Sequence, residues 1–287
     1  LIWMVKHLGS HLVSIDTNTG ATVGYDAWPA STCNAPQSPP STPTTSNTLT
    51  ATQTEPTCYQ FQGGFIHRST YLWLVPSGIN DQFVQMTLLG NAMVGHDVPA
   101  LMPALTGNRP SWFAGAIYDG QHFAYMIPSS SNLLVKLDAW YADFTTFAAW
   151  PTGYNKNDGG SGTGDLALRG GAFDGAHHIW MAPYGAQAIV RFDTITFSMI
   201  STLSLYPSTY VPQSLSFCGV AYDPATKSLW FIPSEQYMLL RLTTTTFTKE
   251  VTETSTYRLH DGITSSIMGL YKTLPLQGPD YQLHGYS

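Results

Sequence analysis

Charged residues are scarce in this sequence, and their scarcity excludes several classes of partner. Only 10% of the 287 residues are Asp, Glu, Lys or Arg, whereas an average soluble domain carries about 25%. The formal net charge is -6, so the chain lacks the basic stripe of a nucleic-acid-binding surface. It also lacks a polybasic cluster that would hold it to an anionic membrane. We therefore expect no nucleic-acid partner, and a surface built mainly from hydroxyl, amide and backbone groups.

Long apolar runs are absent and cysteine is rare. No run of about 18 apolar residues occurs, so the sequence predicts no membrane-spanning helix. Cys33 and Cys58 flank a Pro/Ser/Thr-rich segment. One interpretation is a disulfide that closes this long polar loop in an oxidising compartment, and the other is a pair of unlinked thiols. The third cysteine, Cys218, falls in an apolar strand pattern, which indicates a small core residue.

A repeat of about 50 residues dominates what is present. Each copy begins with a glycine-led strand, as in Gly115-Ala116-Ile117-Tyr118-Asp119 and Gly170-Gly171-Ala172-Phe173-Asp174. A second apolar strand that ends in proline follows, for example Ile179-Trp180-Met181-Ala182-Pro183. A third strand and a fourth complete the unit. The leading glycines are Gly63, Gly115, Gly170, Gly219 and, in a weaker copy, Gly269.

Four short strands in about 50 residues are typical of a β-propeller blade. We therefore predict an all-β chain that folds as a single five-bladed β-propeller of four-stranded blades over residues 1–287. The N-terminal copy lacks a first strand, and the C-terminal region supplies an extra one, so we expect the two ends to share a blade and close the ring. The predicted blades are 1–27 plus 263–273, 61–90, 113–151, 167–207 and 216–254, with a Pro/Ser/Thr-rich insertion at 31–58.

Aspartates recur at the strand ends of the repeat. Asp119-Gly120 and Asp174-Gly175 separate the first strand from the second, and such dipeptides favour a tight primed hairpin turn. Asp16, Asp138 and Asp193 end third strands, where the carboxylate can accept backbone hydrogen bonds in an Asx turn.

The repeat pattern resembles that of kelch-like propellers, and the chain is similar in size to five-bladed lectin propellers. Gly63-Gly64 and Gly170-Gly171 match the kelch Gly-Gly pair. The other copies lack this pair, and the WD dipeptide is absent. The resemblance covers nearly the whole chain and implies a fold, not a function.

The longest loops share one rim of the predicted propeller, which we call the long-loop rim (insertions 28–59, 90–112, 152–166 and 206–215). Long loops on a rigid scaffold commonly carry binding sites. This rim is rich in aromatic and neutral polar side chains, which suit a sugar or a protein surface. For each tyrosine taken alone, packing at the rim is the favoured explanation, whereas the set on one face favours binding. The candidate ligand-binding residues are Trp112, Tyr154, Asn155, Asp158, Asp165, Tyr184, Tyr210, Glu235 and Tyr237.

One loop on this rim, 155–165, is rich in oxygen ligands and glycine. A calcium ion bound by this loop is the one cofactor that the sequence suggests as an alternative. It lacks the glutamate that ends an EF-hand loop, so a surface loop without an ion is the interpretation that we favour. No cysteine or histidine spacing is typical of zinc, and His177-His178 is interpreted as a variant of a hairpin turn.

The sequence contains few residues that could form a catalytic site. Propeller glycoside hydrolases need converging carboxylates, but the chain has only four glutamates, and most aspartates repeat at turns. Asp97, Asp158 and Asp165 are the acids that do not repeat, and we assign no catalytic residue. We expect a non-catalytic binding module, lectin-like or adhesin-like, at an extracellular, cell-surface or virion location, which recognises a carbohydrate or a protein receptor through the long-loop rim. The alternatives are a structural subunit that contacts its neighbours in a larger extracellular or viral assembly, and a propeller glycoside hydrolase or lyase.

Overall fold

The computed structural model describes residues 2–5, 11–29, 61–76, 81–105, 112–152, 154, 166–201, 216–234, 238–245 and 249–253. Over these residues the chain is all-β, as predicted, with five antiparallel sheets and one short helix. No helix in this described part is long and apolar enough to cross a membrane.

Each sheet is built from strands that follow one another along the chain. The first has three strands, and each of the other four has four. The short helix α1 (Val98–Leu101) follows the second sheet. The sheets are β1 (Ile2–Met4), β2 (Leu12–Ile15) and β3 (Thr22–Tyr25); β4 (Phe61–His67), β5 (Tyr71–Pro76), β6 (Gln82–Thr87) and β7 (Met93–Asp97); β8 (Phe113–Tyr118), β9 (Phe123–Pro128), β10 (Leu134–Asp138) and β11 (Asp143–Phe147); β12 (Leu168–Phe173), β13 (His178–Pro183), β14 (Val190–Asp193) and β15 (Met199–Ser201); β16 (Phe217–Asp223), β17 (Ser228–Pro233), β18 (Met238–Thr243) and β19 (Lys249–Glu253).

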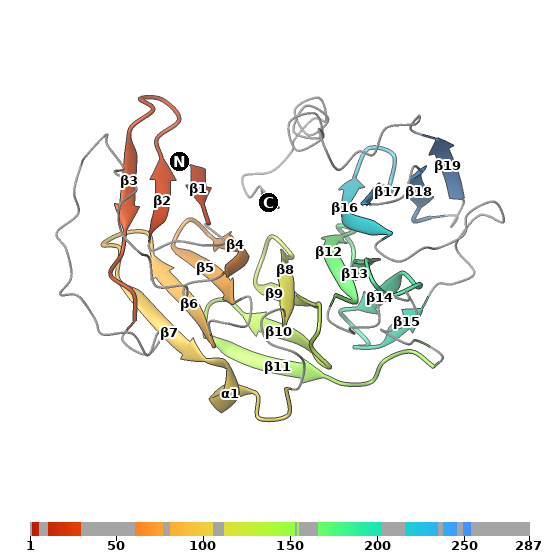
Figure 1. Cartoon of the computed structure of the whole chain (residues 1–287), viewed down its shortest axis with the longest axis horizontal. Helices are drawn as coiled ribbons and strands as arrows, with labels where there is room; N and C mark the ends of the chain where they lie inside the picture. Colours follow the sequence, from red (N-terminus) through yellow and green to blue (C-terminus); the bar gives the residue numbers. More distant parts are fainter. Residues whose placement is uncertain are drawn as a thin grey trace.

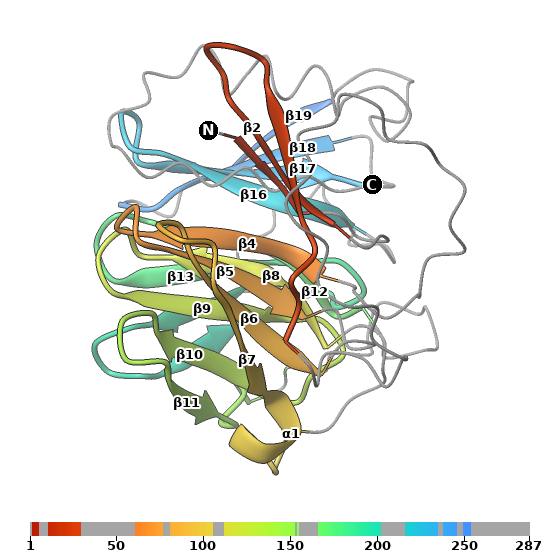
Figure 2. The same ribbon diagram turned by 90° about the vertical axis from the view of Figure 1, so that its left-hand side faces the viewer.

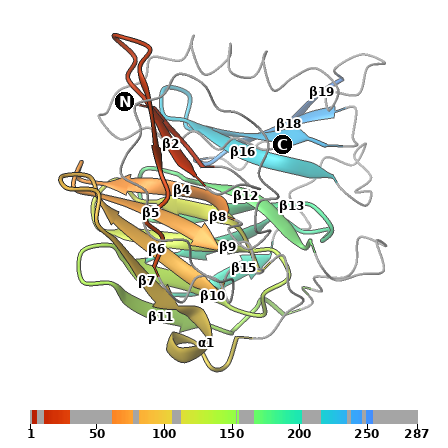
Figure 3. The ribbon, with the colours of Figure 1, turned by 60° about the vertical axis from the view of Figure 1, so that its left-hand side comes forward.

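The five sheets follow one another around an arc, with β1–β3 and β16–β19 at its two ends (Figure 1). The first strands β4, β8, β12 and β16 lie on the inside of the arc, and each contacts the next. Figures 2 and 3 show α1 beyond the end of β7, away from these inner strands. Both β7 and α1 fall within 90–112, so part of that expected insertion is the fourth strand of its sheet.

Apolar side chains fill the space between neighbouring sheets. Strand β5 shows how: Leu72 and Leu74 pack toward the first sheet, whereas Trp73 and Val75 pack toward the third. Burial on both faces explains why the second strand of each repeat is almost continuously apolar instead of alternating. Four such clusters join the five sheets in succession. Within the described residues, no cluster joins the last sheet to the first, and the segment expected to do so, 263–273, lies outside these residues.

The leading glycine of the repeat has a backbone role. Gly63, Gly115 and Gly170 have φ values of 84°, 104° and 77°, and each lies where the register shifts against the second strand. A left-handed residue at a β-bulge favours glycine. In the last sheet the register shift lies between Phe217 and Gly219, so the leading glycine follows the bulge. Gly219 is accordingly not among the glycines with positive φ.

The aspartate turns differ in part from the prediction. Asp119 and Asp174 do not begin two-residue primed turns. Each carboxylate accepts three backbone N–H groups of a longer loop, at 2.7–3.0 Å for Asp119 and 3.0–3.1 Å for Asp174. The following glycines, Gly120 and Gly175, take positive φ values of 78° and 75°. The predicted Asx turns after the third strand are confirmed at Asp16, Asp138 and Asp193.

Candidate functional site

A row of backbone hydrogen bonds connects three sheets along the long-loop rim. Ser129 N donates to Trp112 O at 2.8 Å, and Ala167 N donates to Ser129 O at 3.0 Å. Tyr184 N then donates to Ala167 O at 2.9 Å, and Ser216 N to Tyr184 O at 3.0 Å. Because the row crosses from one sheet to the next, it holds the bases of the adjoining loops in fixed positions. The side chains along it are aromatic, aliphatic or hydroxyl groups without charge.

Three of the predicted ligand-binding residues lie within the described chain, and all three pack against neighbours. Trp112 is 5% exposed and belongs to the cluster between the second and third sheets. Tyr184 is 8% exposed, and the Arg169 guanidinium lies 4.9 Å from its ring centre. Tyr154 stacks on Trp150, with ring centres 5.1 Å apart. These rings are held by their packing contacts, and their contact with a ligand stays a prediction.

The remaining predicted site residues fall outside the described part of the chain. These include the whole 155–165 loop proposed as a calcium alternative. Asp97 is described, and its carboxylate accepts the backbone N–H of Ala100 at 2.9 Å, so it caps α1. Half-buried Cys218 carries a free thiol whose pKa is raised by burial. The residues outside are Asn155, Asp158, Asp165, Tyr210, Glu235, Tyr237 and the predicted disulfide pair Cys33 and Cys58.

Histidine and aspartate side chains gather on the opposite rim, which we call the short-loop rim (turns 68–70, 119–122, 139–142, 174–177 and 194–198). There, Nδ1 of His67 lies 2.8 Å from the Tyr118 hydroxyl. Next to this pair, His122 Nε2 lies 3.0 Å from Asp138 Oδ2. The rings of His67 and His122 meet edge to face, with centres 6.2 Å apart. Burial lowers the pKa of His67, so this imidazole is neutral at pH 7.

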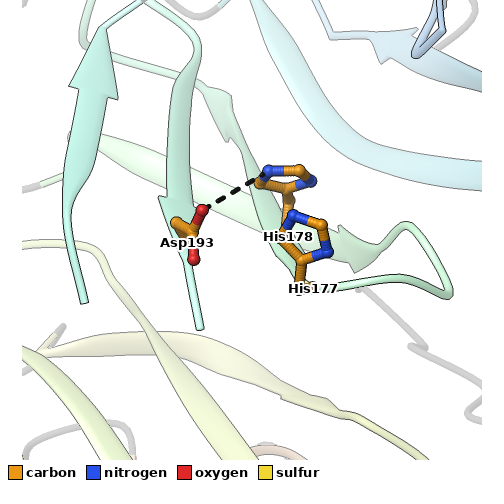
Figure 4. Close-up of side chains that lie close together, drawn as sticks. All are labelled: His177, His178 and Asp193. Carbon is orange, nitrogen blue, oxygen red and sulfur yellow. Dashed lines mark ion pairs between the residues drawn. The ribbon is translucent and has the colours of Figure 1, made fainter. Parts of the chain in front are cut away.

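A second cluster on the same rim combines His177, His178 and Asp193 (Figure 4). One possible ligand atom from each residue lies within 4.8 Å of the other two, an arrangement that could hold a metal ion. His178 is directly opposite Asp193 in the register of β13 and β14, and its Nε2 is 3.8 Å from Asp193 Oδ2. On the other side of the ring, His178 Nδ1 is 2.7 Å from Asp174 Oδ2. Asp174 is buried, and the other three residues are partly buried.

The local hydrogen bonds keep both aspartates of this cluster ionised. Burial opposes the charge of Asp174, but the backbone N–H groups of Ala176 and His178, together with the His178 side chain, outweigh it and lower its pKa. The backbone N–H of Thr196 and then that of Ile195 lower the pKa of Asp193 against a smaller effect of burial. The cluster therefore presents two carboxylates to a pair of imidazoles.

This cluster is not evident from the spacing of residues along the chain, where His177-His178 has the appearance of part of one turn. A cross-strand comparison could have found it. His178 begins a second strand and Asp193 ends a third, and in the neighbouring sheet Phe123 and Asp138 face each other at the same repeat positions. The spacing along the chain hides a pair that antiparallel register places face to face.

No sequence-family model matches this chain, and no curated protein matches it. Solved structures with a similar fold exist. Virginiamycin B lyase from Staphylococcus aureus aligns at a TM-score of 0.56 and 13% identity, over 88% of this chain and 65% of that one. A catalytically inactive variant of the same lyase with quinupristin aligns at 0.58 and 12%, over 88% and 66%. The chain thus spans just under two thirds of the length of these lyases.

Other similar structures include the WD40 repeats of RRP9, at a TM-score of 0.46 and 9% identity, over 67% of this chain and 51% of that one. The similarity to the lyases confirms the β-propeller fold. At these identities it shows the fold alone, since one propeller scaffold hosts many unrelated functions.

Proposed function

We propose that this chain is a non-catalytic β-propeller binding module that recognises a carbohydrate through its long-loop rim, at an extracellular, cell-surface or virion location. The observation that carries the proposal is the unequal chemistry of the two rims. The His/Asp clusters lie on the short-loop rim, whereas the hydrogen-bonded row Trp112–Ser129–Ala167–Tyr184–Ser216 is uncharged. Uncharged hydroxyl and aromatic groups on a rigid frame suit a polar, neutral ligand.

The rigid row also supports binding on energetic grounds. Loops whose bases are already held lose less conformational freedom when a ligand binds, so more of the contact energy appears as affinity. The predicted contacts from the loops themselves are Tyr154, Tyr210 and Tyr237. A propeller of this kind would serve a lectin, an adhesin or a virion attachment component.

The similarity to a lyase does not favour catalysis for this chain. Identity of 12–13% carries over no catalytic residue. Asp97, one of the three acids considered for catalysis, is used as a helix cap. A structural subunit that uses the same rim against its neighbours is the competing proposal, and the binding experiment separates the two.

The test is a glycan array probed with the purified chain, followed by titration of any glycan that binds. We expect binding to a neutral glycan, and we expect Tyr154→Ala and Tyr237→Ala each to weaken it about tenfold or more, since aromatic contacts contribute on the order of 1–3 kcal/mol. The matched control is Tyr141→Ala, which removes an exposed tyrosine from the short-loop rim. Thermal melting of each variant checks that folding is retained.

Failure to bind any glycan would refute the carbohydrate proposal, and so would loss of binding in the Tyr141→Ala control alone. Self-assembly of the chain that Tyr237→Ala disrupts would favour the structural-subunit alternative.

We further propose that the ring has five blades and is closed by residues 263–273, which would add the missing inner strand beside β1. The supporting observation is that the first sheet has three strands and begins with one that corresponds to the second strand of the other sheets. A proline on the added strand removes a donor and weakens its pairing. We expect Leu270→Pro to lower Tm and the hydrogen-exchange protection of β1, whereas Leu283→Pro leaves both unchanged. Equal protection of β1 in the two variants would argue against closure by this segment.

A further inference from the structure

We propose that His177, His178 and Asp193 form a binding site for a divalent transition-metal ion of the zinc class on the short-loop rim. Two imidazole nitrogens and one carboxylate oxygen are a ligand set that zinc accepts in proteins, with the fourth position left to water or to an incoming group. The site lies on the rim opposite the proposed carbohydrate contact, so it does not depend on that function.

The orientation of His178 supports this site. Its Nδ1 lies 2.7 Å from Asp174 Oδ2, and an ionised carboxylate can only accept, so Nδ1 carries the proton. The lone pair is then on Nε2, which faces Asp193. A carboxylate that orients a histidine in this way is the usual outer partner of a metal-binding imidazole.

Asp174 is itself held in place. Its Oδ1 accepts the backbone N–H groups of Ala176, His177 and His178, while Oδ2 faces the His178 ring. The carboxylate and the ring therefore cannot rotate independently. Asp193 is arranged similarly: its Oδ1 accepts the backbone N–H groups of Ile195 and Thr196 at 2.9 Å each, and Oδ2 is directed at His178. The turn itself thus orients the proposed ligand oxygen.

The separation of the possible ligand atoms is also compatible with an ion. His178 Nε2 and Asp193 Oδ2 are 3.8 Å apart, too far for a direct hydrogen bond. Ligand atoms about 2.0–2.2 Å from a tetrahedral zinc ion are roughly 3.4 Å from one another, so the two side chains need to move only by a few tenths of an ångström to share an ion. In the neighbouring sheet, His122 Nε2 and Asp138 Oδ2 are 3.0 Å apart and make a direct hydrogen bond instead.

The neighbouring sheet lacks the second imidazole. There, His122 stands where the fourth sheet has His177, but Phe123 stands where it has His178, opposite the aspartate that ends the third strand. In the fourth sheet, the His177 and His178 ring centres are 4.1 Å apart, and a nitrogen of each ring lies within 4.8 Å of an Asp193 carboxylate oxygen. The carboxylates of Asp174 and Asp193 also bring to the site the negative charge that a dication prefers.

The experiment is calorimetric titration of the untagged, chelator-treated full chain with zinc chloride, together with the visible spectrum of the cobalt(II) form. We expect one zinc ion per chain, a cobalt spectrum typical of tetrahedral coordination, and a Tm that rises when zinc is added. His178→Gln should abolish stoichiometric binding, and His177→Gln should weaken it at least tenfold. Asp174→Asn should weaken it about 10- to 100-fold, because it acts through His178.

His122→Gln is the matched control, since it removes the equivalent histidine of the neighbouring sheet. It should leave zinc affinity unchanged. The metal-free Tm of each variant separates loss of the site from loss of the fold, and the conservative Gln replacements are chosen to keep it. Absence of zinc binding to the wild-type chain would overturn the proposal. So would binding that survives the double variant His177→Gln/His178→Gln, or binding that His122→Gln abolishes.

Discussion

At the scale of single residues, backbone conformation explains a motif that hydrophobicity leaves unexplained. Gly115 lies at a β-bulge of the inner strand β8 with φ of 104°. Any other residue is strained in that conformation, because its Cβ approaches the neighbouring carbonyl. The glycines that mark the repeat therefore report where the inner strand changes register.

We predict that Gly115→Ala lowers the free energy of unfolding by about 1–2 kcal/mol, as expected for a non-glycine residue forced to positive φ. Urea denaturation measures the change. Gly219→Ala is the matched control, because Gly219 is outside the positive-φ set and its added Cβ would meet Ile232 at an ordinary 3.8 Å. Similar losses in both variants would show that crowding, and not conformation, selects the glycine.

Histidine burial makes stability depend on pH. His67 is 0% exposed, and its Nε2 makes no hydrogen bond to the described residues. Burial lowers the pKa of His67, and also that of His96, below the ordinary 6.5. The unfolded chain therefore takes up protons as the pH falls below 6.5, while the folded chain resists them, and stability is lost in that direction. Above pH 6.5 both states are neutral at these positions and the effect disappears.

We predict that the wild-type chain loses stability between pH 7.5 and pH 5.5 and that His67→Asn loses less over the same interval. Asparagine keeps a polar group near the Tyr118 hydroxyl but does not titrate. Urea denaturation at the two pH values measures the difference. If the variant and the wild type show the same pH dependence, His67 does not contribute to acid sensitivity.

At the scale of strands and turns, the second sheet departs from its neighbours. Where the third and fourth sheets use an aspartate loop, the turn between β4 and β5 begins at His67 and continues through Arg68 and Ser69, which have φ values of 47° and 53°. Thr70 N donates to His67 O at 2.9 Å and closes the turn. Two consecutive left-handed residues that are not glycine carry a conformational cost. Arg68 offsets part of it, because its Nε donates to Gln121 O of the next sheet at 3.2 Å.

We predict that Ser69→Gly raises the free energy of unfolding by about 0.5–1 kcal/mol, since glycine adopts the left-handed conformation without steric cost. The rise in Tm measures the effect. Ser69→Ala serves as the control, because it removes the hydroxyl but keeps the Cβ, and it should bring no gain. A lower Tm for Ser69→Gly would mean that the greater freedom of the unfolded chain outweighs the relieved strain.

At the scale of the whole molecule, stability depends on apolar layers between sheets. Phe192 is fully buried in the layer between the third and fourth sheets, where it packs on Tyr125 and Phe147. Phe197 lies nearby, but 47% of it is exposed. The two phenylalanines thus differ mainly in burial.

We predict that Phe192→Ala lowers the free energy of unfolding by about 3–5 kcal/mol, the usual cost of removing a buried aromatic side chain. Phe197→Ala should cost roughly 1 kcal/mol or less, since its ring is already half in water. Chemical denaturation of both variants tests this. Equal losses would indicate that the layer between these sheets is not the main source of stability.

The sequence by itself determined the all-β class, the order of the strands and the Asx turns at Asp16, Asp138 and Asp193. These features depend on local properties: a repeating apolar pattern, and side chains that hydrogen-bond to their own turn. The repeat also predicted that second strands are apolar along their whole length, as β5 is.

Only the tertiary structure decided which of these residues meet. Antiparallel register brings His178 opposite Asp193, and the packing of one sheet on the next buries Trp112 and Tyr184 that the sequence placed on an open rim. Both outcomes depend on contacts between segments far apart in the chain. A local pattern specifies that a residue is in a strand or at a loop, but the depth of that residue and its cross-strand partner follow from how the strands and sheets align.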